Sequence, residues 1–344
     1  MNTAPEITIL IPVLNEYRRI VPCLNSVFAQ DYPLEKIEVI IADGGSTDGT
    51  QQLIRETFPD RENLRIADNP RRTQAAAFNL GIKLSRATYL IRMDAHCVYA
   101  PTYVSRIVRR LKEDPRRGNV GGAWDFAPGA DSYMGNAVCI FNQCRFGIGG
   151  ATFRVGGEAG EVDTVPFGAF PRTTIDRIGG MNEILFRGED NEYNARIHAS
   201  GQTVFFDPQI RCTYFCRPTL GTCLKQMWAN GLSIGLLMRY APYGIGLRHM
   251  VPAVFFLALV FGLATVWIPY CWIFTVFLVL LHQAAGSVAA LSAGKKFGMR
   301  YFWILPLIFL SNHVAYGAGT VVGMVRYFVF GKKDGKCQTH KTGV

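Results

Sequence analysis

Two long uncharged stretches near the carboxyl end constrain the fold of this chain more than any other feature. Residues 249–294 contain no Asp, Glu, Lys or Arg, and neither do residues 301–325. A helix of about 20 apolar residues crosses a bilayer once, so the first stretch fits two passes that meet near Pro269. The second stretch is long enough for a third pass. No soluble core requires such runs, and the sequence therefore predicts a membrane region over residues 249–330.

The positive charge of the chain is concentrated in the same region. The formal net charge is +10, and residues 249–344 hold eight Lys or Arg but one acidic residue, Asp334. Cations that flank apolar spans contact anionic lipid. A nucleic-acid-binding protein would instead carry a basic stripe on its soluble part, and residues 1–248 have no such stripe. The pattern predicts membrane lipid as a partner and excludes nucleic acid.

The amino-terminal part is expected on the cytosolic side of the membrane. Its apolar run, residues 7–14, is too short for a secretory signal, lacks a preceding basic region and contains Pro12. Residues 220–248 mix aromatic and basic side chains, which is typical of amphipathic helices in the membrane interface. The predicted organisation is thus a cytosolic domain over residues 1–219, interfacial helices, the membrane region, and a basic tail over residues 331–344.

The sequence leaves the topology of the third apolar stretch open. Two passes return the chain to the cytosol at Lys295, Lys296 and Arg300, as the positive-inside rule prefers. A third full pass would export the basic tail. Either the tail violates the rule, or the third stretch, interrupted at residues 311–313, re-enters the membrane without crossing it.

The first third of the chain alternates β-branched runs with segments of helical spacing. Three runs have the composition of buried strands, at residues 7–12, 37–42 and 88–93. Helices are expected between and after them, over residues 18–29, 51–58 and 73–85. This order predicts an α/β fold with a mostly parallel sheet covered on both faces. Ligands of such sheets bind beyond the carboxyl ends of the strands.

Polar side chains follow these strands at that position. Asn15 and Glu16 come after the first strand, and Asp43 comes after the second, next to Gly44 and Gly45. Glycines let the backbone approach a ligand closely, and a carboxylate there can accept the imide N–H of a uracil. Helix capping explains Asp48 but leaves Asp43 without a role. The pattern favours a nucleotide site that includes Asp43.

Asp94-Ala95-His96 follows the third strand. Two side chains that can bind a metal, at positions i and i+2 of a tight turn, can face one cation. Carboxylate and diphosphate oxygens suit Mg²⁺, whereas an imidazole ligand shifts the preference towards Mn²⁺. Such an ion would neutralise the charge that develops on a leaving diphosphate. The structural alternative for this motif taken alone is a solvated acid in a turn.

Gly188-Glu189-Asp190-Asn191-Glu192 places three carboxylates at the start of an expected helix, residues 189–199. The helix dipole favours anions there, which accounts for Glu189. Asp190 is a candidate general base that takes a proton from an acceptor hydroxyl. If the acceptor attacks the anomeric carbon of a sugar on a nucleotide, a single direct displacement inverts that carbon, so one base and one metal ion suffice.

The segment between these motifs is rich in glycine. From residue 120 to 171 the chain lacks periodicity, apart from a short strand expected over residues 162–165. A further strand is expected over residues 203–207. We expect the segment 145–166 to be a mobile loop that closes over donor and acceptor.

The motifs in this order resemble those of the family 2 inverting glycosyltransferases with the glycosyltransferase A fold. The resemblance covers about residues 5–210 and rests on Ile11-Pro12-Val13-Leu14-Asn15-Glu16, Asp43 to Thr50, Arg92 to His96, and Glu189-Asp190. It implies that Pro12, Asn15, Glu16 and Asp43 hold the uridine, with Asp94 beside the donor. It also implies that Asp94 and His96 hold a metal ion with the diphosphate, and that Asp190 is the base.

A narrower resemblance concerns Met93 to His96 and the run Asp163 to Gly168. Together with the carboxyl-terminal spans, they resemble the succinoglycan-biosynthesis (ExoA-type) branch. Those enzymes extend lipid-diphosphate-linked saccharides at the cytoplasmic face, with UDP-sugars as donors. The implied function is transfer of one sugar, glucose from UDP-glucose, to a polyprenyl-diphosphate-linked saccharide in a bacterial cell membrane.

Two features depart from the wider family. His96 stands where most members have the second Asp of a DxD motif. Gln226-Met227-Trp228 keeps the Gln of the QxxRW motif of processive synthases but lacks its Arg-Trp, which argues against polymerisation. Four side chains remain candidates for contacts with the acceptor or its phosphate: Glu189, Arg172, Gln226 and Trp228.

Two alternative functions remain open from the sequence. One keeps the chemistry but makes polyprenyl phosphate itself the acceptor. The other is a membrane transport or scaffold protein whose amino-terminal domain binds nucleotide. Intramembrane charges, the usual mark of a transport pathway, are absent from residues 249–294.

Overall fold

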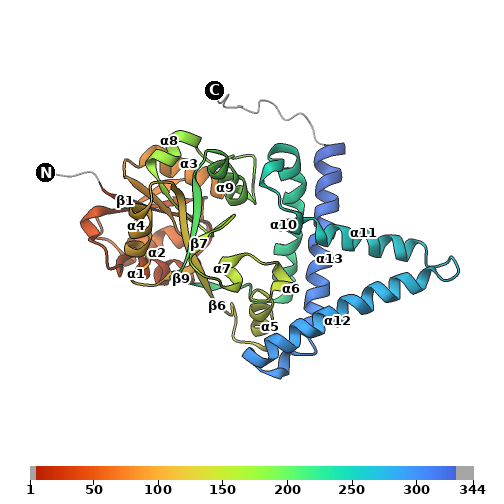
Figure 1. Cartoon of the computed structure of the whole chain (residues 1–344). Coiled ribbons are helices and arrows are strands. Elements are labelled where there is room, and N and C mark those ends of the chain that lie inside the picture. Colours follow the sequence, from red (N-terminus) through yellow and green to blue (C-terminus); the bar gives the residue numbers. More distant parts are fainter. Residues whose placement is uncertain (1–4, 331–344) are drawn as a thin grey trace.

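A computed structural model describes residues 5–330. The predicted basic tail, residues 331–344, lies outside the described residues. One mixed sheet with helices on both sides forms the amino-terminal domain, and the long helices α10 to α13 follow it (Figure 1).

The first half of the sheet is parallel, as the alternating pattern predicts. The strand order here is β3-β2-β1-β4, and β1 pairs with β2 from Ile7↔Ile37 to Val13↔Asp43. Buried β-branched side chains fill these strands, because both faces are covered. The strands are β1 (Ile7–Val13), β2 (Ile37–Asp43), β3 (Leu64–Asp68) and β4 (Tyr89–Arg92).

The second half of the sheet is mixed. β8 joins it to β4 in antiparallel orientation, and β6 and β9 run parallel to each other beyond β8. Two short strands pair antiparallel with β9. The strands are β5 (Cys97–Tyr99), β6 (Arg117–Ala127), β7 (Gly160–Glu161), β8 (Ala169–Pro171) and β9 (Thr203–Phe215).

The prediction of a strand over residues 162–165 is wrong. β7 ends at Glu161, and after one more ladder bond, from Val162 N–H to Val204 O, the chain leaves the sheet edge. Phe167 and Gly168 adopt left-handed φ values of 60° and 90°, which break a regular strand before β8. The strand predicted over residues 203–207 is present and extends to Phe215.

Helices cover both faces of the sheet, which confirms the expected α/β fold. Ile20 of α1, Ile54 of α2 and Ile107 of α4 belong to the core of one face, and Phe78 of α3 and Ile197 of α9 to that of the other. The helices are α1 (Ile20–Phe28), α2 (Thr50–Thr57), α3 (Gln74–Leu84), α4 (Tyr103–Glu113), α8 (Arg172–Ile178) and α9 (Glu189–Ala199).

The glycine-rich segment contains short helices rather than a continuous loop. They are α5 (Tyr133–Phe141), α6 (Arg145–Ile148) and α7 (Thr152–Val155). Phe141 of α5 packs in a core with Phe309, far along the chain. This segment therefore joins the sheet domain to the helices that follow.

Three of the later helices are long and apolar enough to cross a membrane: Leu247–Ala264, Cys271–Phe297 and Leu305–Phe328. In each of the first two, 11% of the most apolar stretch of 18 residues is buried against protein, compared with 44% in the third. The helices are α10 (Leu220–Tyr240), α11 (Val251–Ala264), α12 (Cys271–Phe297) and α13 (Leu305–Met324).

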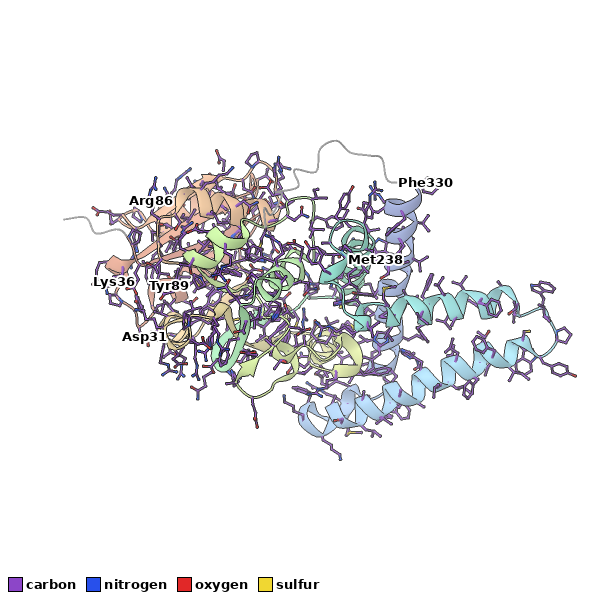
Figure 2. The ribbon with its side chains drawn as sticks, turned by 45° about the horizontal axis from the view of Figure 1, so that its top comes forward. Asp31, Lys36, Arg86, Tyr89, Met238 and Phe330 are labelled. Carbon is purple, nitrogen blue, oxygen red and sulfur yellow. The ribbon has the colours of Figure 1, made fainter. Side chains whose placement is uncertain are left out.

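These helices form two units. α10 and α13 lie side by side, whereas α11 and α12 form a hairpin that projects away from them at a steep angle (Figure 1). Figure 2 shows the side chains of the outer hairpin extending into open space. In place of several helices over residues 220–248, the chain forms one long helix, α10, followed by short 3₁₀ turns.

Candidate active site

The candidate site lies beyond the carboxyl ends of three neighbouring parallel strands. Asn15 follows β1, Asp43 is the last residue of β2, and Asp94 follows β4. Because β2, β1 and β4 are adjacent and parallel, these residues reach the same edge of the sheet. The strand-end positions predicted from the sequence are thus brought together.

Asp43 closes the loop that follows β2. Its Oδ2 accepts hydrogen bonds from the N–H groups of Gly45 (2.9 Å) and Ser46 (2.9 Å) and from Nε2 of Gln51 (2.6 Å). Burial acts to raise the pKa of Asp43, but the hydrogen bonds from Ser46 and Gln51 outweigh it and lower this pKa. The residue therefore has a structural role that the sequence did not reveal, and it stays ionised at neutral pH.

The loop after β1 is tied to the loop after β2. Asn15 adopts a left-handed φ of 57°, its N–H donates to Ser46 Oγ, and its Oδ1 accepts from the N–H of Thr47. A shallow pocket opens here, lined by Asn15, Glu16, Tyr17, Arg18, Arg19 and Asp48. Pro12 lies in β1 opposite Ala42 and supports this edge. Asn15 and Glu16 thus line this pocket whereas Pro12 and Asp43 do not, and the uridine-binding roles of all four stay predictions.

Arg92, the last residue of β4, joins the acidic motifs. Its side chain is 2% exposed, and its guanidinium donates to Asp94 Oδ1 (3.2 Å), Asp190 Oδ1 (2.6 Å) and Gln74 Oε1 (2.7 Å). Glu189 lies 3.5 Å from Arg92 Nη1. One buried cation thus holds the strand-end aspartate and the α9 carboxylates in one cluster.

The charges of this cluster do not cancel. Burial disfavours the charged form of Arg92, but Asp190 and Asp94 outweigh it and raise the pKa of Arg92. Burial and the neighbouring Asp190 raise the pKa of Glu189 to about 7, and burial raises the pKa of Asp190. Three carboxylates face one guanidinium, so the site has a negative surplus that a divalent cation would neutralise.

The Asp94-Ala95-His96 turn is fixed by Tyr99. The Asp94 N–H donates to Tyr99 Oη (2.6 Å), and the Tyr99 hydroxyl donates to the Asp94 carbonyl. His96 Nδ1 lies 3.5 Å from Glu16 Oε1, and its ring contacts that of Tyr214 at 5.4 Å. The turn therefore presents a carboxylate and an imidazole next to the nucleotide loops.

The residues present fit a metal ion that is shared with a diphosphate. Among residues 5–330, no three His, Cys, Asp or Glu side chains are placed to hold an ion by themselves. Asp94 and His96 offer one oxygen and one nitrogen ligand, and the negative surplus around Arg92 attracts a cation. Diphosphate oxygens would complete the coordination, as is usual for Mg²⁺ or Mn²⁺ in such sites.

Glu189 and Asp190 start α9 but differ in exposure. Glu189 is 3% exposed, whereas the Asp190 side chain is 35% exposed. Gly188 before them has a φ of +81°, and a side chain there would meet Leu237 of α10. Asp190 is therefore the carboxylate of the pair that an incoming substrate can touch, whereas the burial of Glu189 conflicts with the acceptor or phosphate contact predicted for it.

The structure separates Arg172 from the other predicted residues. Its guanidinium donates to the carbonyls of Ile82, Ser85 and Ala87, and its N–H donates to Thr88 O at the start of β4. This is the end of the strand opposite to Asp94. The phosphate contact expected of Arg172 conflicts with this position.

Gln226 and Trp228 lie on α10. Gln226 Oε1 accepts a weak hydrogen bond from Arg217 Nε (3.4 Å), and Trp228 is 40% exposed. Gln226 also bonds to the hydroxyl of Tyr214, the residue whose ring contacts His96. The structure thus places Gln226 near the site, and Trp228 on a surface of the same helix.

Sequence reasoning assigned no role to Arg92 or Tyr214. A cation within the buried run 88–93 was a usable signal, because a fully buried Arg requires anionic partners. Tyr214 gave no such signal, since aromatic residues are common in strands.

Comparison with known proteins agrees with the fold. The model of glycosyl transferase family 2 matches residues 8–150. A Methanococcus voltae protein, "dolichyl N-acetyl-alpha-D-glucosaminyl phosphate 3-beta-D-2,3-diacetamido-2,3-dideoxy-beta-D-glucuronosyltransferase", is 30% identical over 250 residues, covering 70% of this chain and 76% of that protein. "Succinoglycan biosynthesis protein ExoA" of Rhizobium meliloti is 29% identical over 266 residues, or 73% and 75% of the two chains.

Among solved structures, the mannosyltransferase PcManGT from Pyrobaculum calidifontis, in complex with GDP-Man and Mn²⁺, superposes with a TM-score of 0.58. It is 21% identical, and the match covers 93% of this chain and 88% of that one. The fold and the strand-end acids define a glycosyltransferase A enzyme. The chain belongs to glycosyl transferase family 2, an inverting family. It is therefore an enzyme rather than a transport or scaffold protein.

Proposed function

We propose that the protein transfers a single sugar from a UDP-sugar to a lipid-linked saccharide at the cytoplasmic face of a membrane. The observation that carries this proposal is the Arg92 cluster, which joins Asp94 of the strand edge to Asp190 of α9. It lies in the domain that continues directly into α10 and the apolar hairpin.

The donor would bind across the strand ends. Asn15, Glu16 and Asp43, supported by Pro12, would hold the uridine between the two loops. Asp94 and His96 would hold Mn²⁺ or Mg²⁺ against the diphosphate. A bound ion neutralises charge on the leaving group and so lowers the barrier to its departure. The Mn²⁺ in the structure of the mannosyltransferase PcManGT supports this cofactor.

Asp190 would act as the general base. Arg92 holds Asp190 Oδ1, so Oδ2 can face the acceptor. It would take the hydroxyl proton as the acceptor oxygen bonds to the anomeric carbon on the side opposite the leaving diphosphate, which inverts that centre. Burial raises the pKa of Asp190 and so strengthens it as a base.

The acceptor would be a saccharide on a polyprenyl diphosphate, and the sugar would be glucose. Two relatives support a lipid-borne acceptor in glycan synthesis: the M. voltae enzyme is named for a dolichyl-linked sugar phosphate, and ExoA for succinoglycan. The incomplete QxxRW motif at Gln226 supports one transfer per acceptor rather than polymerisation.

The α11–α12 hairpin would cross the membrane and α13 would not. The packing of α13 and the aromatic residues at the hairpin tip favour this topology. α13 lies along α10 at a steep angle to the hairpin (Figure 1), and it is the most buried of the three apolar helices. Trp267 and Tyr270, both 78% exposed, lie at the hairpin tip, where an aromatic belt would meet the far interface. The basic tail then remains in the cytosol.

A transfer assay with purified protein in lipid nanodiscs tests the function. We expect transfer from one of a panel of radiolabelled UDP-sugars, UDP-glucose first, to a polyprenyl-diphosphate-linked saccharide, and its loss in EDTA. Product on bare polyprenyl phosphate would instead select the alternative acceptor. No transfer from any UDP-sugar to either lipid would contradict the proposal, and undiminished activity in EDTA would remove the metal from it.

A further inference from the structure

Three arginines without carboxylate partners gather between the candidate site and α10. Arg154 belongs to α7, Arg187 precedes α9, and Arg217 follows β9. Their hydrogen bonds to side chains go to neutral amides, those of Asn142, Asn230 and Gln226. In the part of the chain that the structure describes, no Asp or Glu oxygen lies within ion-pair distance of any of the three.

Tyr214 connects these arginines. Its ring stacks on Trp124, with centroids 4.2 Å apart and planes 6° apart, and Arg154 lies 4.7 Å above the Trp124 ring. Arg154 and Arg217 both act electrostatically on the Tyr214 hydroxyl. The buried indole N–H of Trp124 has no hydrogen-bond partner in the described residues. We call Arg154, Arg187 and Arg217 the arginine cluster.

Within the described residues the cluster forms no ion pair, and Glu189 exerts only a longer-range attraction on Arg187. Burial and the nearby charge of Arg217 lower the pKa of Arg187, and burial lowers the pKa of Arg154. Arg154 and Arg187 are partly buried and Arg217 is exposed, and like charges held close to one another favour the binding of an anion. Guanidinium groups bind phosphate oxygens through paired, charge-assisted hydrogen bonds, so a phosphate or diphosphate matches the cluster best.

The position of the cluster points to the acceptor rather than the donor. Gln226 and Asn230, which contact Arg217 and Arg187, lie one turn apart on α10. α10 packs along α13, the helix from which the apolar hairpin projects. A phosphate on a lipid lies at the bilayer surface, next to such helices. His96, on the donor side, contacts the ring of Tyr214.

In the glycine-rich segment, two glycines flank the short helix that carries Arg154. Gly149 (φ +80°) and Gly156 (φ +86°) lie on either side of α7, which carries Arg154. A side chain added at either glycine would meet nothing within 4 Å, so neither glycine is required by packing. Both have positive φ values, which glycine adopts readily, so Arg154 lies between two positions where the backbone conformation rather than packing favours glycine.

We propose that Arg154, Arg187 and Arg217 bind the phosphate or diphosphate of the lipid-linked acceptor. This inference rests on the proposed function, because it requires a lipid-borne substrate. It adds a second anion site, separate from the donor site at Asp94 and His96, and assigns the glycine-rich segment to acceptor recognition.

Direct binding tests the inference without depending on turnover. Full-length protein in neutral-lipid nanodiscs would be titrated with farnesyl diphosphate in the presence of saturating UDP. We expect wild-type binding to survive UDP and to weaken about tenfold or more in Arg154→Gln, Arg187→Gln and Arg217→Gln, as expected for loss of a charge-assisted contact. UDP affinity should change less than about twofold. Arg116→Gln, which removes an exposed arginine paired with Asp114, is the control.

Three outcomes would overturn the inference. Wild type could fail to bind farnesyl diphosphate, UDP could compete with it, or the variants could lose UDP affinity to the same extent. A fourth outcome concerns phosphatidylglycerol. If the variants lost binding to this lipid to the same extent as to farnesyl diphosphate, the cluster would be a general anionic-lipid site, which would also contradict the inference. If wild type transfers no sugar yet binds farnesyl diphosphate through the cluster, the proposed function fails and the cluster remains a site for lipid phosphate, without the role in acceptor recognition.

Discussion

At the scale of single residues, Arg92 is the residue that connects the most parts of the candidate site. It is buried, and it reaches carboxylates of both the strand edge and α9, which are nearly a hundred residues apart in the chain. Its removal would leave Asp94, Glu189 and Asp190 close together without a compensating charge. The site therefore depends on one cation that never needs to touch the substrate.

Replacing Arg92 by Gln should destabilise the protein strongly. Breaking a buried ion pair by removing one partner costs about 3–5 kcal/mol, because the other charges stay buried. Thermal unfolding in detergent should show a large fall in melting temperature, and a bound divalent cation should restore part of it. Arg116→Gln, at an exposed pair, should leave the melting temperature unchanged. A melting temperature of Arg92→Gln equal to that of wild type would contradict this role.

Asp43 should stabilise its loop only while it is ionised. Its pKa is lowered in the folded protein, so its stabilisation is present above the ordinary aspartate pKa of about 3.9 and is lost as the pH falls through the folded-state value. Asp43→Asn should therefore lower the melting temperature and weaken UDP binding at pH 7. The difference in melting temperature should shrink as the pH falls below about 4. Asp60→Asn, at an exposed aspartate, is the control, and a difference that does not depend on pH would contradict the assignment.

The sequence predicts the positions of site residues well where one strand end determines them. Asn15, Asp43 and Asp94 follow buried runs, so the parallel sheet alone brings them to one edge. The sequence does not predict the contact of Arg92 with Asp190, because this contact depends on how distant segments pack. Arg172 is the opposite case. It lies near the motif Asp163 to Gly168 in the sequence, but in the fold it lies at the end of β4 far from Asp94.

At the scale of elements, close backbone approach explains what the sequence pattern missed. β6 contains Gly118, Gly121 and Gly122, which made the segment resemble a loop. A side chain at Gly122 would lie 1.8 Å from the carbonyl oxygen of Ile210 in β9. Close packing requires the glycines of this strand, since added side chains would also meet Ile197 at Gly118 and Val165 at Gly121. Packing does not require Gly149 or Gly156, and composition alone does not distinguish the two cases.

The packing of α10 against α13 should depend on two glycines. A side chain at Gly231 would lie 2.1 Å from Tyr316 O, and one at Gly235 would lie 2.1 Å from the Gly323 carbonyl carbon. Small residues allow such close helix contacts. Gly231→Ala and Gly235→Ala should each lower the melting temperature, because the helices must separate.

Gly221→Ala, on the same helix, is the matched control. Nothing lies within 4 Å of a side chain added there, so the substitution should raise helix stability by about 0.5–1 kcal/mol. Equal effects of the three substitutions on the melting temperature would show that the α10–α13 contact is not close in the membrane.

At the scale of the whole molecule, the angle between the two helical units supports the proposed topology, which hydropathy left open. All three apolar helices are long enough to span a bilayer, and composition alone does not distinguish them. The difference lies in packing, because α13 buries part of its surface against α10, whereas α11 and α12 expose theirs. If the proposed topology holds, hydropathy alone counts one span too many, because α13 is covered by its own protein.

Reporter fusions in a bacterial host should distinguish the topologies. Alkaline phosphatase, which is active only outside the cytoplasm, should be active when fused after Tyr270, at the hairpin tip, and inactive when fused after Val344. A fluorescent protein fused after Val344 should be bright. Active phosphatase at the carboxyl end would mean that α13 crosses the membrane, and would contradict the proposed arrangement.

The central claim is that Asp190 activates an acceptor for direct attack on a UDP-sugar bound at the strand edge. The most direct measurement compares Asp190→Asn with wild type in two assays on the same preparation: UDP binding by calorimetry, and transfer of labelled sugar to a lipid-linked acceptor. Loss of a general base should reduce transfer by roughly 10²-fold or more. The account predicts this loss with UDP affinity retained, and normal transfer by Asp190→Asn would contradict it.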